Sequence, residues 1–160
     1  MLEIHERLPR TDADHASSAE IVLTLAFEAR QRCRQRVVLE DGSERALLLP
    51  RGTTLRDGDR LRDTEGAIIR VRAAPETVSV ARTTDRHLLV RAAYHLGNRH
   101  VPLQIDIDSL RYRHDHVLDA MVEGLGLSVS CEQVSFEPEP GAYAHDGHGG
   151  HGGHAHPGAA

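Results

Sequence analysis

The sequence contains no lysine and no tryptophan, and its aromatic residues are only two Phe and three Tyr among 160 residues. Without lysine the chain has neither a Schiff-base amine nor a G-x-x-x-x-G-K-[ST] loop for hydrolysing a nucleotide. All 19 basic residues are arginines, spread along the chain, and the formal net charge is -5. Because a nucleic-acid-binding protein normally presents a basic face with stacking aromatics, that function is not expected.

The sequence also lacks long apolar runs. Its N-terminus, MLEIHERLPR, carries acidic residues where a signal peptide has a basic segment and an apolar run. No later run approaches the ~18 to 20 apolar residues of a membrane-spanning helix. The two cysteines, Cys33 and Cys131, form no C-x-x-C pair, which fits a reducing compartment and gives neither a zinc ribbon nor a redox motif. We therefore expect a cytoplasmic protein without a membrane partner.

The first half of the chain shows short strand patterns separated by turn residues. The segments rich in β-branched and aliphatic residues are 19–27, 36–39, 44–49 and 67–72. Residues 40–43 (EDGS) form a turn signal between two of these segments. Closely spaced short strands favour a small β-barrel or sandwich, and Pro75 interrupts the pattern. Residues 1–74 are therefore predicted to form a small all-β domain.

The second half alternates between strand and helix patterns. The strand patterns cover residues 76–81, 103–107, 110–112 and 127–136, and the helix patterns cover 84–96 and 115–125. Thr84 is the predicted N-cap of the first helix, and Gly97 and Gly126 are the predicted stops. The order βαββαβ is that of a ferredoxin-like unit, in which two helices cover one face of an antiparallel sheet. We predict this α+β fold for residues 75–137, with the other sheet face free for a partner.

The C-terminal segment, residues 138–160, is predicted to be disordered because it is rich in proline and glycine and poor in apolar side chains. It carries five histidines separated mainly by glycine, which are His145, His148, His151, His154 and His156. Imidazole ordinarily has a pKa near 6.5, so it is mostly neutral at pH 7 and ready to bind a metal. The five are predicted metal ligands, and by ligand type Ni, Cu and Zn all remain open.

Three further histidines are candidates. His114 and His116 flank Asp115 at the start of the second predicted helix, where they can bind a metal or act as acid and base. Asp115 also suits the positive end of a helix dipole without any ligand. Because no G-x-S-x-G, H-E-x-x-H or paired carboxylate motif accompanies them, an enzyme is not expected. His100 follows the predicted helix stop, where a histidine commonly caps the helix, but in a two-fold dimer it would face its own copy.

Four stretches, in this order and spacing, resemble the UreE family of urease accessory proteins, which are nickel metallochaperones. They are LLPRGTTLRDGDRL (48–61), IRVRAAPE (69–76), AYHLGNRH (93–100) and HDHVLD (114–119), followed by the histidine-rich tail. The resemblance implies an N-terminal β domain suspected of binding peptides and a ferredoxin-like domain that binds metal and dimerises. It also implies that His100 meets its two-fold mate and anchors Ni(II), with His114 and His116 as accessory ligands in some members.

The resemblance implies partners as well. A homodimer would carry Ni(II) as cargo, with Zn(II) or Cu(II) able to bind in vitro, and deliver it to the urease apoprotein activation complex. That complex's accessory GTPase would supply the nucleotide step that this chain lacks. Two alternatives stay open: a general nickel or zinc store that needs no His100 interface, and a hydrolase built on His114, Asp115 and His116.

Overall fold

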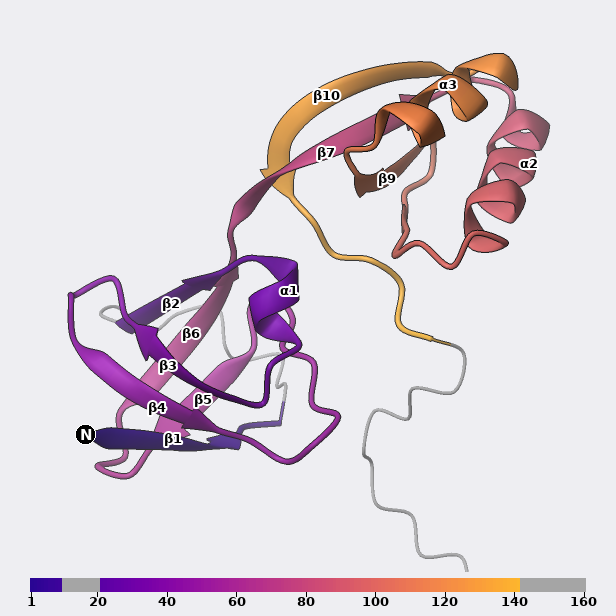
Figure 1. The fold of residues 1–160 in the computed structure, drawn as a ribbon. Coiled ribbons are helices and arrows are strands. Elements are labelled where there is room, and N and C mark those ends of the chain that lie inside the picture. The colour runs from indigo at the N-terminus through magenta and orange to yellow at the C-terminus, as the bar shows by residue number, and fades with distance from the viewer. Residues whose placement is uncertain (10–20, 142–160) are drawn as a thin grey trace, which may run out of the picture.

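A computed structural model of the chain describes residues 1–9 and 21–141. In these residues the strands form two sheets, one of six strands and one of four, and the helices are few and short. Figure 1 shows two bodies joined by β7 (Pro75–Arg82), the long strand that leaves the first body and enters the second. The chain therefore has a mixed α+β fold, with one sheet in each half.

The first sheet is mixed, with strand order β2-β6-β5-β1-β4-β3. Its strands are β1 (Leu2–Arg7), β2 (Ile21–Leu25), β3 (Arg34–Val38), β4 (Glu44–Leu48), β5 (Arg60–Asp63) and β6 (Ile68–Ala73). Two neighbouring pairs, β1 with β4 and β2 with β6, are parallel, and the others are antiparallel. Because alternate side chains on a strand point to opposite faces, Ile69 and Val71 of β6 are buried while Arg70 and Arg72 are exposed. The buried face forms an aliphatic core.

The expectation of an all-β first domain is wrong at one place. The predicted strand 19–27 ends at Leu25, and α1 (Phe27–Arg30) follows as a single helical turn. The Phe27 N–H donates to the Glu76 carboxylate at 2.8 Å, and Arg30 N–H donates to the Ala26 carbonyl at 3.0 Å. The Phe27 N–H therefore binds the distant Glu76 side chain instead of a neighbouring strand, and the predicted strand ends before it.

The second sheet has strand order β10-β7-β9-β8, and all neighbouring strands are antiparallel. Its other strands are β8 (Gln104–Ile105), β9 (Ser109–Arg113) and β10 (Ser128–Ser135). The helices α2 (Arg86–Gly97) and α3 (His116–Gly124) pack on one face of this sheet around a buried aliphatic cluster. The element order is the βαββαβ order that the sequence predicts.

Both of these helices begin at an aspartate. The Asp85 carboxylate accepts hydrogen bonds from the first free N–H groups of α2, and Asp115 does the same for α3. The prediction of Thr84 as N-cap is therefore wrong by one residue. Gly97 is also not the stop, because it is the last residue of α2, whereas Gly126, with φ 106°, does follow the end of α3. None of the helices in the described ranges is long and apolar enough to cross a bilayer.

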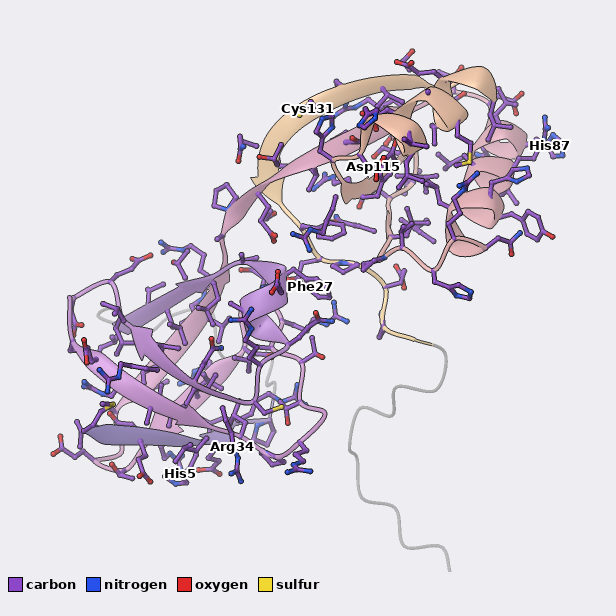
Figure 2. All side chains as sticks on the ribbon, in the orientation of Figure 1. His5, Phe27, Arg34, His87, Asp115 and Cys131 are labelled. Atoms are coloured by element: carbon purple, nitrogen blue, oxygen red, sulfur yellow. The ribbon has the colours of Figure 1, made fainter. Side chains whose placement is uncertain are left out.

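The sheet face opposite α2 and α3 is not fully free, contrary to the expectation from the sequence. Val78 and Val80 of β7 pack on this side with Phe27 of the first domain and Phe136. The two phenyl rings meet edge to face, with centroids 5.7 Å apart. Figure 2 shows Phe27 at the side of the first domain that faces the junction. The chain thus covers part of this face itself.

Residues 136–139, here called the returning segment, run from β10 back between the two domains (Figure 1). The fully buried Arg30 donates to the Phe136 carbonyl and pairs with Glu137. Arg56 donates to the Pro138 carbonyl at 2.6 Å, and Glu139 N–H donates to the Leu103 carbonyl at 2.8 Å. The prediction that disorder begins at residue 138 is therefore wrong for Pro138 and Glu139. The rest of the predicted tail from residue 142 onward, with its five histidines, lies outside the described residues.

Candidate metal site

His100 lies in the turn that follows α2, with its side chain exposed. Its backbone has φ 57°, and it is the one non-glycine residue with positive φ in the described ranges. Its N–H donates to the Gly97 carbonyl at 3.0 Å, and the Arg99 N–H donates to the Leu96 carbonyl at 3.0 Å. A left-handed conformation costs a residue with a side chain about 1–2 kcal/mol, so the surrounding turn must hold it in place. The backbone of His100 is fixed while its imidazole is presented to solvent.

An exposed apolar stripe on α2 leads toward this turn. Val90 and Tyr94 lie one helical turn apart and are 67% and 66% exposed. Residues four apart share a helix face, and the same face continues to Asn98, two residues before His100. These two side chains form a small apolar patch on the exposed face of α2.

His114 follows β9 and is held on one side by the protein. Its Nδ1 lies 3.0 Å from Ser79 Oγ and 3.2 Å from Asp119 Oδ2. The Tyr112 hydroxyl donates to the other carboxylate oxygen, Asp119 Oδ1, at 2.8 Å. Ser79 and Tyr112 are fully buried, whereas the His114 side chain is 42% exposed. His114 Nε2 makes no hydrogen bond to the part of the chain that the structure describes.

The charges around His114 follow from burial and hydrogen bonding. Burial raises the pKa of Tyr112, and the hydrogen bond to Asp119 raises it further, so the phenol stays protonated and donates. The backbone N–H groups of Leu118 and Val117 hold the pKa of Asp115 below its usual value. His116 is the first residue of α3 and is exposed, and its side chain has no hydrogen-bond partner within the described ranges.

Ser79, His114 and Asp119 do not form a nucleophile triad. In a triad the serine and the aspartate contact different nitrogens of the imidazole, so that a proton can pass through the ring. Here both contact Nδ1, and Ser79 is fully buried in β7. This geometry gives no activated serine at Ser79, and it does not test the hydrolase alternative built on His114, Asp115 and His116.

The predicted ligands do not complete a metal site within the described part of one chain. Residues 1–9 and 21–141 contain no group of three or more His, Cys, Asp or Glu side chains arranged to hold a metal ion. Late first-row metal ions commonly take about four ligands in proteins. A site built on His100 must therefore be completed by groups beyond these residues, from the tail or from another chain.

Family models for both halves match the sequence. The C-terminal domain of the UreE urease accessory protein matches residues 76–159, and its N-terminal domain matches residues 4–74. The chain belongs to the UreE family of urease accessory proteins.

Individual relatives agree with this assignment. A protein of Alkalilimnicola ehrlichii named "Urease accessory protein UreE" is 54% identical over 143 residues, which is 89% of this chain and 85% of that protein. A protein of the same name from Pseudomonas putida is 60% identical over 122 residues, 76% of this chain and 73% of the relative. One from Citrobacter koseri is 56% identical over 135 residues, 84% of this chain and 89% of the relative. The UreE resemblance noted in the sequence is confirmed.

A surface hollow of about 690 Å³ lies beside the start of α2 in this UreE-family chain. Its lining includes Arg82, Thr84, Arg86, Asp108 and Ser128. Among the described residues, its lining includes none of the histidines His100, His114 and His116.

Sequence reasoning found His114 but missed the three side chains around it. Ser79 gives a weak signal, since it is the one hydroxyl within the apolar run 78–81 (VSVA). The register of β7 and β9 places Ser79 opposite Tyr112, and α3 brings Asp119 to both. Contacts that join three separate elements leave no periodic pattern in the sequence, so they could not be predicted from it.

Proposed function

We propose that this chain is a nickel carrier for urease maturation. In this proposal a homodimer captures Ni(II) between its two His100 side chains, and the tail histidines complete the coordination. The dimer then passes the ion to the urease apoprotein activation complex through an accessory GTPase in the cytoplasm. Membership of a family of urease accessory proteins supports the urease role, and it indicates an accessory protein rather than the urease enzyme itself.

The observation that carries the proposal is the position of His100. One imidazole makes a poor metal site, but a two-fold axis brings the same residue from two copies together. The stripe of Val90 and Tyr94 provides apolar surface that a second copy would remove from water. If the two stripes pack with the C-terminal ends of both α2 helices together, the two His100 turns lie near each other.

The root of the tail supports a role for the tail histidines at His100. The hydrogen bond from Glu139 N–H to the Leu103 carbonyl fixes the returning segment three residues beyond His100. His145 follows Glu139 by six residues, which span at most about 20–22 Å when fully extended. Tethered ligands within such a distance have a local concentration in the mM range, so they can complete a site that His100 begins.

Imidazole coordination suits a cargo that must be released. The proposed site contains no thiolate, so it is not biased toward a closed structural zinc site or toward Cu(I). Zn(II) and Cu(II) are expected to compete with Ni(II) in vitro. The first domain is proposed to contact the client.

Native mass spectrometry of the full-length chain with and without Ni(II) tests the proposal. We expect dimers that carry one more nickel ion than the tails alone bind, and we expect His100→Ala to lose that ion. His87→Ala is the matched control, because His87 is also an exposed histidine, at the start of α2 (Figure 2). A chain that stays single-copy at saturating Ni(II) would contradict the proposal.

The alternative function, a general nickel or zinc store, uses the same tail without the His100 interface. Replacing the five tail histidines by glutamine distinguishes the two functions. For a store, this change removes nearly all bound metal and His100→Ala removes none. For a carrier, His100→Ala also removes bound metal, because the shared ion depends on this residue.

A further inference from the structure

We propose that Glu137 is a positioning residue that couples the first domain to the His100 turn. Its side chain binds the first domain and its backbone binds the loop that follows His100, so one residue links the two. Loosening the junction between the domains therefore also loosens the nickel site. This inference rests on the proposed function, since it concerns how the same carrier holds and releases its nickel.

The first step concerns the Glu137 side chain, which is bound by first-domain groups although Glu137 follows the last strand of the second domain. Its carboxylate pairs with Arg30 and lies 3.7 Å from the Arg56 guanidinium. The Asp57 N–H donates to the same carboxylate at 3.3 Å. The Arg30 side chain is fully buried, and the Glu137 side chain is 27% exposed. Because a buried guanidinium that loses its charged partner is strongly destabilising, Arg30 holds the carboxylate in this place.

The second step concerns the Glu137 backbone, which binds the second domain. The Glu137 N–H donates to the side-chain oxygen of Gln104 at 2.8 Å, and the returning segment also donates to the Leu103 carbonyl. The side-chain nitrogen of Gln104 lies 3.3 Å from Asp106 Oδ1, so the amide is held with its oxygen toward Glu137. Leu103 and Gln104 lie three and four positions after His100. The returning segment is therefore bound to the loop that leads from the imidazole.

The third step concerns the freedom of the two domains. The chain passes covalently between them at Ala74, between β6 and β7, before it returns through the segment that contains Glu137 (Figure 1). A single covalent crossing permits two domains to rotate about it, and each further attachment restricts that rotation. The returning segment supplies such an attachment through Phe136, whose ring meets Phe27, and through Glu137. It therefore sets both the angle between the domains and the place where the tail begins.

The fourth step is the effect on the proposed nickel site. While the returning segment is bound, the tail begins at Glu139, six residues before His145, and after release it begins at Ser135, ten residues before His145. The effective concentration of a tethered ligand falls with about the 3/2 power of tether length, so release lowers that of His145 at His100 by about 2-fold. Loss of the contacts to the loop after His100 adds to this effect. The coupling is reciprocal, so nickel bound there favours the attached segment by the same factor.

The first measurement is the orientation of the two domains in the full-length, metal-free chain, obtained from residual dipolar couplings in NMR. In the unchanged chain we expect one alignment tensor to fit both domains. Glu137→Gln keeps the size of the side chain and removes its charge, and we expect it to give each domain a separate tensor. Glu132→Gln is the matched control and should keep a single tensor, because Glu132 pairs with Arg82 inside the second domain.

The second measurement is a Ni(II) titration of the full-length chain, followed by broadening of the His100 ring signal. Glu137→Gln is expected to raise the Ni(II) concentration needed for this broadening by at least about 2-fold, and Glu132→Gln should leave it unchanged. Arg56→Met removes a partly exposed partner of the same carboxylate. It is expected to change the tensors and the titration in the same direction, and it serves if Glu137→Gln does not fold.

The third measurement follows the coupling in reverse, by hydrogen–deuterium exchange of peptides that contain Glu137 and Glu139. Saturation with Ni(II) is expected to slow exchange of these N–H groups by about 2-fold, and His100→Ala is expected to abolish this protection. A Glu137 that only stabilises the fold would show the same exchange with and without Ni(II).

Three results would overturn this inference. They are a single tensor for both Glu137→Gln and Arg56→Met, separate tensors with an unchanged Ni(II) response at His100, and exchange at Glu137 that Ni(II) does not alter while His100 binds it. Failure of the proposed function has a different signature, because the His100 ring of the unchanged chain would then show no Ni(II) response, whatever the orientation of the domains.

Discussion

His100 and His114 belong to the same domain, but the fold supports them in different ways. The His114 ring is contacted by Ser79 and by Asp119, from two other elements. At His100 only the backbone is held, and its imidazole has no hydrogen-bond partner among the described residues. A ring oriented within one chain is prepared for its ligand by the fold alone. A ring fixed only through its backbone depends on groups that arrive from outside, which in the proposed function are the tail and a second copy.

The largest expected effect comes from removing the apolar stripe that leads to His100. Tyr94→Ala is expected to weaken the dimer by about 2 kcal/mol per copy, hence about 4 kcal/mol and roughly 1,000-fold in dissociation constant. Sedimentation equilibrium measures this change. Val38→Ala, an exposed apolar position of β3 in the first domain, is the control and should leave the dimer intact. If Tyr94→Ala dimerises with an unchanged dissociation constant, the apolar stripe is not the dimer interface.

The junction that fixes the tail root gives the next largest effect. Arg30→Met is expected to lower the free energy of unfolding by about 3 kcal/mol, because it leaves buried acceptors without a donor. Those acceptors are the carbonyls of Leu55 and Phe136. The Leu25 carbonyl keeps the Ala74 N–H as a donor, and the partly exposed Glu137 keeps Arg56. Urea denaturation measures the loss. The same change is expected to weaken nickel binding by the tail at His100 and to leave the His114 ring signals as they are.

Arg32→Met is the control for the junction. Arg32 pairs with Glu28 on the surface, where both side chains are more than half exposed. Its removal should change the free energy of unfolding by no more than about 0.5 kcal/mol. Equal losses from Arg30→Met and Arg32→Met would mean that the buried contacts of Arg30 do not hold the returning segment.

The smallest effect is expected at Asp115, which begins the helix carrying Asp119. Because hydrogen bonds hold its pKa below the usual value, ionised Asp115 adds stability above the unfolded pKa near 4. This contribution is lost as the pH falls through the lower, folded-state pKa. The stability difference between the unchanged chain and Asp115→Ala should therefore be full at pH 7 and shrink as the pH is lowered from 4 toward 2.

Asp115→Asn separates the charge from the cap. Asparagine also caps helices but does not titrate, so it should retain most of the stability at pH 7. Acid unfolding followed by circular dichroism compares the three proteins. If the deficit of Asp115→Ala stays constant down to pH 2, the carboxylate charge does not contribute.

The sequence predicts the second domain better than its junction with the first. Hydrophobic periods of about 3.6 and of 2 residues alternate between residues 76 and 136, and Gly126 marks the end of a helix, so local rules suffice there. The helix α1 and the returning segment depend on partners far along the chain. Phe27 binds Glu76, 49 positions away, and Arg30 binds Glu137, 107 positions away. No local pattern contains such contacts.

The candidate site divides in the same way. His114 and His116 could be proposed from their spacing, but the contact of His114 with Asp119, which also accepts from Tyr112, arises only through the packing of α3 on β9. His100 could be proposed from its motif and from two-fold symmetry. The left-handed backbone of His100 could not be predicted, because glycine is the residue that usually adopts this conformation after a helix. The sequence offers Gly97 for that role, but in the structure Gly97 is the last residue of α2.

The central claim is that two copies of the chain share one nickel ion through His100. The most direct test is a crystal structure of the full-length protein with Ni(II), using anomalous scattering at the nickel edge to locate the ion. The account predicts a nickel peak on a two-fold axis, with a His100 nitrogen from each copy at about 2.1 Å, a distance typical of imidazole bound to such ions. A nickel peak bound by histidines of one chain alone, with the two His100 side chains too far apart to share it, would contradict the account.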